Sequence, residues 1–169
     1  MKFDSIEVAL QAIKAGEMVV VVDDDDRENE GDLIMAASKA TPEAVAFMIR
    51  QTSGILCTPI LQDHATALHL DPMVGRNDAP MSTAFTISID YKQGLTTGIS
   101  AEERAATAVA LTSNNVAAED FVRPGHIFPL VARQGGVLVR SGHTEAGTDL
   151  AQLAAVSYTH LTLPTIVRV

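Results

Sequence analysis

The chain has 169 residues, 47% of them apolar and 4% aromatic, which suffices for one domain with a core of aliphatic side chains. Its formal net charge of −9 is concentrated in residues 23–32, DDDDRENEGD, and the remainder has 14 acidic against 11 basic residues. No basic run is present to bind nucleic acid, and no apolar run approaches the length of a membrane span. Cys57 is the only cysteine and the first residues lack an apolar signal segment, so we predict a cytoplasmic protein.

Apolar residues at helical spacing alternate along the chain with short apolar runs typical of strands. Thr41-Pro42 and Ser100 are typical helix starts, the second with Glu103 as a capping box, and residues 18–22 are predicted to form a strand buried on both faces. In chain order we expect a helix over residues 5–16, strands over 18–22 and 33–37, a helix over 41–52, a strand over 55–60, a short helix and a mobile loop (75–78) within 61–80, a strand over 83–90, a helix over 100–113, strands over 126–132 and 136–140, and a helix capped by Thr144 through residue 153.

This order of elements predicts a single-domain α/β (α+β) fold, with a three-layer α/β/α arrangement around a mixed twisted sheet. No internal repeat or linker divides the chain. The loops that follow the strands are therefore the places where polar side chains from distant parts of the sequence can meet.

The acidic segment, residues 23–32, lies between two predicted strands and is the first candidate site. It does not fit a calcium loop of the EF-hand type, because the sixth position counted from Asp23 is Glu28 instead of glycine. Carboxylates at a strand end could still bind one hard cation such as Mg²⁺, which keeps several of its waters. A solvated acidic turn without a task explains the segment equally well, and the segment alone does not decide between the two.

The second candidate site is GGVLVRSGHTEAGTDL, residues 135–150. A strand is predicted to end at Arg140 and a helix to begin near Thr144. Backbone amides at a helix start, beside an arginine, suit an anion such as phosphate. His143 lies in the same turn and could bind a metal or transfer a proton. Glycine-rich turns of this kind are common, so the stretch alone is a weak signal.

RPGHIF, residues 123–128, is the third candidate, because proline and glycine fix a turn that presents His126 just before a predicted strand. For a lone histidine in this setting, a structural hydrogen bond is a more common role than proton transfer. The other residues with reactive side chains show no catalytic pattern: His64, His69 and His160 are expected to be surface or packing residues, Ser82, Thr96 and Ser100 lack a partner for a nucleophile, and Cys57 is expected in the core.

Four motifs occur in a fixed order along the chain: DDDDRENEGDL, Thr96-Thr97-Gly98-Ile99-Ser100, RPGHIFPL and RSGHTEAGTDL. In that order they resemble the 3,4-dihydroxy-2-butanone 4-phosphate synthase family over residues 1 to about 155, and DRENEGD is highly specific to it. The resemblance implies the conversion of D-ribulose 5-phosphate to 3,4-dihydroxy-2-butanone 4-phosphate and formate in riboflavin biosynthesis. It also implies a homodimer that uses Mg²⁺ or Mn²⁺ and has its active sites near the subunit interface.

The same resemblance implies roles for single residues. The metal ligands would be Glu28 and His143, while Asp23 and its neighbours to Asp26 would only adjust the local field. By motif match, the catalytic residues would be His126 in proton transfer and Glu30 lining the pocket, and the substrate-binding residues would be Arg27, Glu28, Asp32, Arg140, Ser141, Gly142, His143 and Thr144.

Residues 156–169, VSYTHLTLPTIVRV, depart from the family pattern. That pattern continues with a turn, a strand that bears an essential glutamate, and a final helix. Residues 156–165 are instead similar to an in-frame translation of a transposase adapter used in preparing sequencing libraries. We therefore expect a partial domain over residues 1–155, incomplete at its C-terminus, followed by a non-native tail. A chain of this kind is expected to be weakly active or inactive and to aggregate; a divergent native tail is the alternative.

Three other functions are compatible with parts of the pattern. The chain could be the synthase half of a bifunctional protein with a GTP cyclohydrolase II domain. It could be another metal-dependent sugar-phosphate enzyme, such as an isomerase or aldolase, which would release no formate. It could also be a non-catalytic module that binds a phosphosugar or a cation, and a change of His126 would then leave affinity nearly unaltered.

Overall fold

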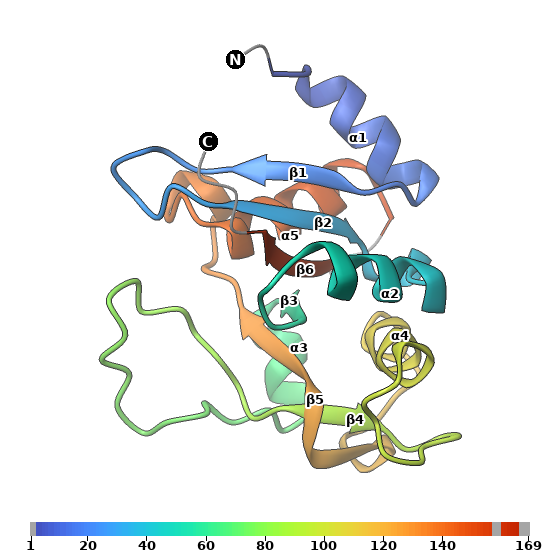
Figure 1. Ribbon diagram of the computed structural model, residues 1–169. Helices are drawn as coiled ribbons and strands as arrows, with labels where there is room; N and C mark the ends of the chain where they lie inside the picture. Colours follow the sequence, from blue (N-terminus) through green and yellow to red (C-terminus); the bar gives the residue numbers. More distant parts are fainter. Residues whose placement is uncertain (1–2, 157–159, 166–169) are drawn as a thin grey trace.

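The computed structural model describes residues 3–156 and 160–165. Helices and strands interleave along the chain, as the sequence predicts (Figure 1). The helices are α1 (Ile6–Ala15), α2 (Pro42–Gln51), α3 (Gln62–Ala67), α4 (Ala101–Ala110) and α5 (His143–Leu153); the strands are β1 (Val19–Val22), β2 (Gly31–Ala36), β3 (Cys57–Ile60), β4 (Ile89–Tyr91), β5 (Phe121–Val131) and β6 (His160–Thr165); and short 3₁₀ turns cover Ala37–Lys39, Ala118–Asp120 and Gly136–Leu138. Within this part of the chain, no helix has the length and apolar character needed to cross a membrane.

The strands form one sheet in the order β1-β2-β6-β3-β5-β4. The pair β3–β5 is parallel, and the other neighbouring pairs are antiparallel. The predicted mixed sheet is therefore confirmed. β6 lies in the interior of the sheet, where it pairs with β2 along its whole length and with β3 at one position.

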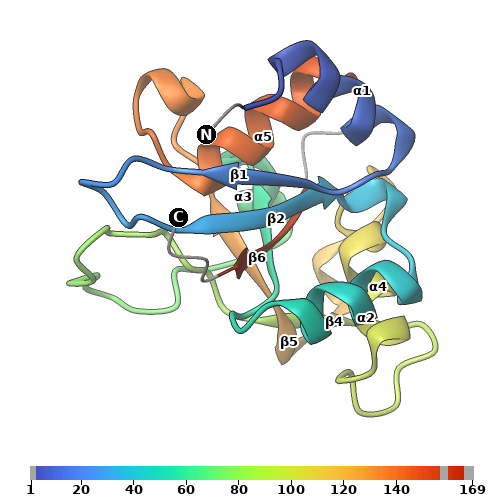
Figure 2. The same cartoon turned by 45° about the horizontal axis from the view of Figure 1, so that its top comes forward.

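Helices cover both faces of this sheet, and the side chains of β2 alternate between the two layers. Leu33 and Met35 pack into the larger core, to which α2 and α4 contribute. Ile34 and Ala36 point the other way, into a smaller cluster with Ile13 of α1. Figure 2 shows α1 beside α5 on one side of the sheet and α2 beside α4 on the other, which is the predicted three-layer arrangement.

The helix ends follow from their capping residues. The Thr41 hydroxyl accepts a hydrogen bond from the Ala44 amide at 3.2 Å, and Pro42 occupies the first helical position. The Ser100 hydroxyl accepts one from the Glu103 amide at 3.1 Å. α1 ends at Gly16, whose φ of +86° is the left-handed conformation that glycine adopts without strain. These three boundaries agree with the sequence prediction.

β1 is an edge strand, which corrects the prediction that it is buried on both faces. Among the described strands it pairs with β2 alone, and Val20 is 58% exposed. The apolar run of β1 resembles that of an interior strand, so composition alone could not reveal its position. β2, in contrast, is buried at all six positions, as expected for the second strand.

Three further boundaries differ from the prediction. Regular strand structure near residues 83–90 is limited to β4, and only isolated bridges pair Thr86 with Pro72 and Phe85 with Leu130. Residues 136–140 begin as a 3₁₀ turn instead of a strand, because Gly135 and Gly136 both have positive φ angles. Helix α5 starts two residues earlier than predicted, at His143, with Gly142 as its cap in place of Thr144.

The segment from residue 71 to residue 82 is exposed throughout and extends from the body of the protein as a long loop (Figure 1). The mobility predicted for its residues 75–78 stays a prediction. Several contacts tie this loop to the rest of the fold. The Met81 carbonyl accepts a hydrogen bond from Arg140 at 3.1 Å, and the Asp71 carbonyl accepts one from the Ile87 amide at 3.0 Å.

Candidate active site

The loop between β1 and β2 is organised by Asp23, the first residue after β1. One carboxylate oxygen accepts the Glu30 amide at 2.9 Å. The other accepts the Glu28 amide at 3.2 Å and the Arg27 guanidinium at 2.5 Å. The loop therefore folds around a single carboxylate, which holds the Glu28 side chain on the same side as its own.

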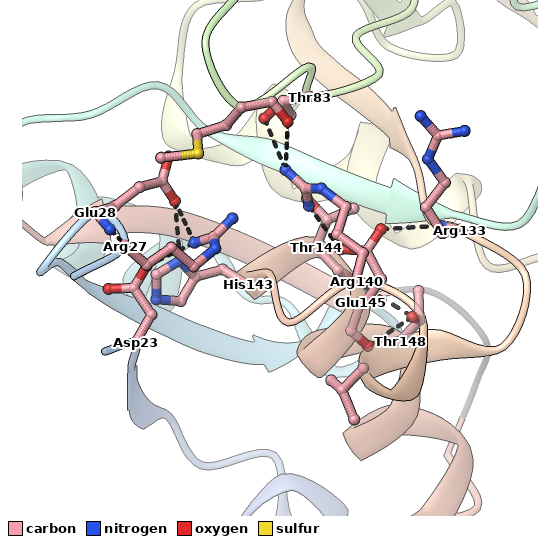
Figure 3. A network of polar contacts seen from close by, with 12 residues as sticks. Asp23, Arg27, Glu28, Thr83, Arg133, Arg140, His143, Thr144, Glu145 and Thr148 are labelled. Carbon is pink, nitrogen blue, oxygen red and sulfur yellow. Dashed lines mark hydrogen bonds and ion pairs between the residues drawn. The ribbon is translucent and has the colours of Figure 1, made fainter. Parts of the chain in front are cut away.

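His143, at the start of α5, faces this loop from the other end of the chain (Figure 3). Its Nδ1 lies 3.9 Å from a carboxylate oxygen of Glu28 and 3.9 Å from one of Asp32. Both distances are too long for a direct hydrogen bond. The structure thus brings Arg27, Glu28, Asp32 and His143 together, as the sequence predicts, from segments more than 100 residues apart.

The electrostatics of the loop are those of a site crowded with negative charge. Burial raises the pKa of Asp23, but the hydrogen bonds from the Glu30 amide and from Arg27 outweigh it, so the pKa is lowered. Burial, followed by the nearby charges of Glu28 and Asp32, raises the pKa of Glu30. Arg27 is thus the arginine that pairs with both Asp23 and Glu28 in this loop. A bound cation would reduce the remaining repulsion among the carboxylates.

The donor set fits a divalent cation. Asp23, Glu28 and His143 each offer one ligand atom, and these atoms lie within 4.8 Å of one another. The imidazole of His143 is buried, and its Nε2 has no hydrogen-bond partner among the described residues. Oxygen ligands with one imidazole suit Mg²⁺ and Mn²⁺. This geometry favours a cation site over a solvated acidic turn for Asp23 and Glu28. Asp24, Asp25 and Asp26 are not part of the group.

Arg140 and the start of α5 form the second part of the site (Figure 3). The guanidinium donates to the Glu145 carboxylate at 2.6 Å and to the Thr83 hydroxyl at 3.3 Å. Glu145 is only 1% exposed and also accepts the Arg133 amide. A Cβ added at Gly142 would lie 2.2 Å from the Arg140 guanidinium, so only glycine leaves room for this arrangement. Ser141 is exposed, while Thr144 is buried behind the turn.

His126 lies elsewhere, on β5. Its Nδ1 is 2.7 Å from one oxygen of Asp90, and its amide donates to the other at 2.8 Å. β5 is separated from β2 by β6 and β3, which corresponds to three strand intervals or about 14 Å. The sheet of one chain thus separates the strand of His126 from β2, which follows the acidic loop.

Sequence reasoning missed three residues that the structure places in these clusters. Asp23 immediately follows a strand, and this position could have identified it as a ligand. Glu145 could have been found from its place in the first turn of a helix, five residues after Arg140. Asp90 carries no local signal, because 36 residues separate it from His126.

The other residues weighed from the sequence have structural positions. Cys57 is buried as predicted, and burial, followed by the charge of Asp32, raises the pKa of its thiol to about 12. Thr96 and Ser100 both donate to the Glu103 carboxylate. His160 lies in β6, where only the strand itself is described.

The fold and the clusters define a class of protein: an α/β domain with a carboxylate–imidazole group suited to a divalent cation and, at the same helix start, an arginine paired with a buried glutamate. Within that class, the chain belongs to the 3,4-dihydroxy-2-butanone 4-phosphate synthase family, whose family model matches residues 7–167. The resemblance seen in the sequence motifs is thereby confirmed.

Individual relatives agree with this assignment. Riboflavin biosynthesis protein RibBA of Rhodococcus erythropolis is 57% identical over 153 residues, which are 90% of this chain and 36% of that protein. The 3,4-dihydroxy-2-butanone 4-phosphate synthase of Helicobacter hepaticus is 53% identical over 152 residues, 90% of this chain and 42% of that protein. The chain therefore spans less than half the length of these curated relatives.

Solved structures show the same fold. The crystal structure of a 3,4-dihydroxy-2-butanone 4-phosphate synthase in complex with two magnesium ions superposes with a TM-score of 0.94 at 46% identity. The superposition covers 96% of this chain and 76% of that one. The predicted α/β fold is therefore that of a magnesium-containing relative.

Proposed function

We propose that this domain catalyses the conversion of D-ribulose 5-phosphate to 3,4-dihydroxy-2-butanone 4-phosphate and formate, in riboflavin biosynthesis, with Mg²⁺ or Mn²⁺. The observation that carries the proposal is the meeting of Asp23, Glu28 and His143 within 4.8 Å. Family membership supports the reaction, and the magnesium ions in a relative support the metal.

Glu28 and His143 would hold the metal, and Asp23 would join them. A bound divalent ion supplies a Lewis acid that stabilises the negative oxygen of an enediolate. Asp23 has a second task, because its hydrogen bonds to the loop amides keep Glu28 turned toward His143.

Other residues of the domain would bind and orient the substrate. Arg27 is positioned to contact it beside the metal ligands, and Asp32, on the buried strand β2, to accept hydrogen bonds from sugar hydroxyls. Arg140 and the turn through Thr144 would hold the phosphate, since a helix start and a guanidinium both favour an anion. Glu30 would line the pocket near the reacting carbons.

His126 would transfer protons, and a homodimer would bring it to the metal cluster of the other subunit. This arrangement is supported by the sheet order, which keeps His126 away from Glu28 within one chain. The test mixes Glu28→Ala subunits with His126→Gln subunits, both inactive alone. Each mixed dimer has one intact site of two, and random exchange in an equal mixture makes about half of the dimers mixed. The mixture should therefore show about a quarter of the activity of the same amount of unsubstituted dimer. No restoration in confirmed mixed dimers would contradict the shared site.

Product analysis separates this function from the alternatives. Ribulose 5-phosphate labelled with ¹³C is incubated with Mg²⁺ and a version of the domain that carries a family-like C-terminus, and the products are followed by NMR. Formate with a four-carbon phosphate is the expected result. A five-carbon isomer or two shorter sugars would indicate an isomerase or aldolase, and binding without turnover would indicate a non-catalytic module.

We also retain two proposals that concern the whole protein. The first is that residues 1–155 are the native domain and residues 156–169 a non-native tail, which the similarity of residues 156–165 to an adapter sequence supports. The family match runs to residue 167, so the alternative is a native strand at β6. Native genomic DNA running through codons 156–165 would contradict the first proposal. The second is a cytoplasmic location, supported by the single cysteine of the sequence.

A further inference from the structure

We propose that Asp90 is a positioning residue that fixes the tautomer of His126, with the proton on Nδ1 and the free lone pair on Nε2. The proposal rests on the proposed function of His126 in proton transfer. It gives a role to a buried carboxylate that no motif of the sequence points to.

Two bonds to the same residue hold His126 in place. Asp90 accepts the His126 amide with one oxygen, at 2.8 Å, and approaches Nδ1 with the other, at 2.7 Å. The register between β4 and β5 shifts between Ile89 and Asp90, and an irregularity of this kind re-aims a side chain within a sheet. The carboxylate is thus turned onto the neighbouring strand, where it contacts both the backbone and the ring of one histidine.

The turn that precedes α4 closes over the pair. A Cβ added at Gly98 would lie 2.0 Å from an Asp90 oxygen and 2.7 Å from the His126 Nδ1, so only glycine permits this approach. Glu103 fixes the turn, because its carboxylate accepts the Gly98 amide at 3.1 Å and the Thr96 amide at 2.5 Å. The turn therefore packs directly against both Asp90 and the His126 ring.

The tautomer follows from hydrogen-bond chemistry. An ionised carboxylate only accepts hydrogen bonds, so the ring nitrogen that faces Asp90 must be the donor. In the neutral ring this leaves Nε2 unprotonated and able to accept a proton from a substrate carbon or hydroxyl. The His126 side chain is 38% exposed while that of Asp90 is 5% exposed, so the ring has access to ligand and the carboxylate does not.

The first test measures the tautomer in the intact chain, without reference to activity. The ¹⁵N shifts of the His126 ring, assigned by their loss in His126→Gln, are expected to show a protonated Nδ1 and an unprotonated Nε2 in the neutral ring. A protonated Nε2, or equal populations of both tautomers, would overturn the proposal even if the domain is an active synthase. A version with a family-like C-terminus that shows the expected tautomer but releases no formate would leave the positioning intact and contradict the proposed function instead.

The second test changes Asp90 to Asn. The asparagine oxygen can accept the His126 amide, which turns its NH₂ group toward Nδ1 and demands the opposite tautomer. We expect the proton to move to Nε2 and, in the version with a family-like C-terminus, kcat for formate release to fall about 10²–10⁴-fold, with KM nearly unchanged. Asp120→Asn is the matched control, since Asp120 caps the Ala117 amide and does not contact His126.

A double-variant cycle separates positioning from general structural damage. If Asp90 acts through His126, adding Asp90→Asn to His126→Gln should lower kcat no further. An additional loss in the double variant, or an unchanged kcat in Asp90→Asn alone, would overturn the proposal.

Discussion

Two loops of this protein gather carboxylates, and they do so in opposite ways. In the turn at residues 96–103, one acid, Glu103, accepts hydrogen bonds from two amides and two hydroxyls. In the loop at residues 23–32, several acids share one arginine and face a buried histidine. Where donors outnumber carboxylates, the acid serves the fold; where carboxylates outnumber donors, the loop is suited to a cation.

The pKa values of one glutamate in each loop, Glu103 and Glu30, shift in opposite directions. Hydrogen bonds from the Thr96 amide and hydroxyl, with further donors, lower the pKa of Glu103 to about 2. Burial and neighbouring charge instead raise the pKa of Glu30 in the acidic loop. Substitution of Glu103 should therefore lower the stability of the fold, whereas substitutions in the acidic loop should mainly change cation binding and charge repulsion.

The largest effect is expected for Glu28→Gln. Loss of a charged ligand from a group of three should weaken Mn²⁺ binding by at least about 100-fold, by comparison with the loss of groups that only support a ligand. Titration calorimetry and Mn²⁺ electron paramagnetic resonance measure this directly. The control is Asp25→Asn, an exposed acid of the same loop. Equal weakening by both variants would show that the loop binds cations only through its net charge.

Arg140→Met should destabilise the fold by about 2–3 kcal/mol, because it leaves the buried Glu145 carboxylate without its ion-pair partner. Urea unfolding of the metal-free protein measures the change. The double variant Arg140→Met/Glu145→Gln should recover part of the loss, since no unpaired charge remains. If the double variant is less stable than Arg140→Met alone, the ion pair is not the cause.

Glu103→Gln should change the pH dependence of stability. The folded pKa of about 2 lies below the ordinary value of 4.5, so ionised Glu103 stabilises the fold above about pH 4.5. That contribution is lost as the pH falls toward 2. The free energy of unfolding should depend less on pH across this range in the variant than in the wild type. Glu102→Gln should leave this pH dependence unchanged. The same pH dependence of unfolding free energy in the wild type and in Glu103→Gln would contradict the structural role of Glu103.

Glu30→Gln should give the smallest effect and the opposite sign. Because its folded pKa is raised, ionisation of Glu30 opposes folding, and this cost is present once the pH exceeds the folded pKa. The metal-free variant should therefore be slightly more stable at pH 7, by up to about 0.5 kcal/mol. Mg²⁺ should reduce the gain, because the cation offsets the same repulsion. A less stable variant in chelator would indicate that the acidic loop is not repulsive.

The sequence predicted the site better where function lies within one motif than where it depends on the sheet. DRENEGD predicted that Arg27, Glu28 and Asp32 lie together, and the structure places the first two in the loop and Asp32 at the start of β2. The anion site that the helix-start argument predicted at Arg140 stays a prediction. The contact between Asp90 and His126 could not be predicted from the sequence, because it depends on a register shift between β4 and β5. The exposure of β1 was missed because an apolar strand at the edge of a sheet has the same composition as one in its middle.

Formate release from ribulose 5-phosphate tests the central claim most directly. The rate is measured with and without Mg²⁺ for this chain and for a version with a family-like C-terminus, each beside its Glu28→Ala variant. We predict Mg²⁺-dependent formate from the version with the family-like C-terminus, little or none from this chain, and none from either Glu28→Ala variant. Formate from this chain at the full rate would contradict the proposal for residues 156–169, and formate that persists without Glu28 would contradict the metal site.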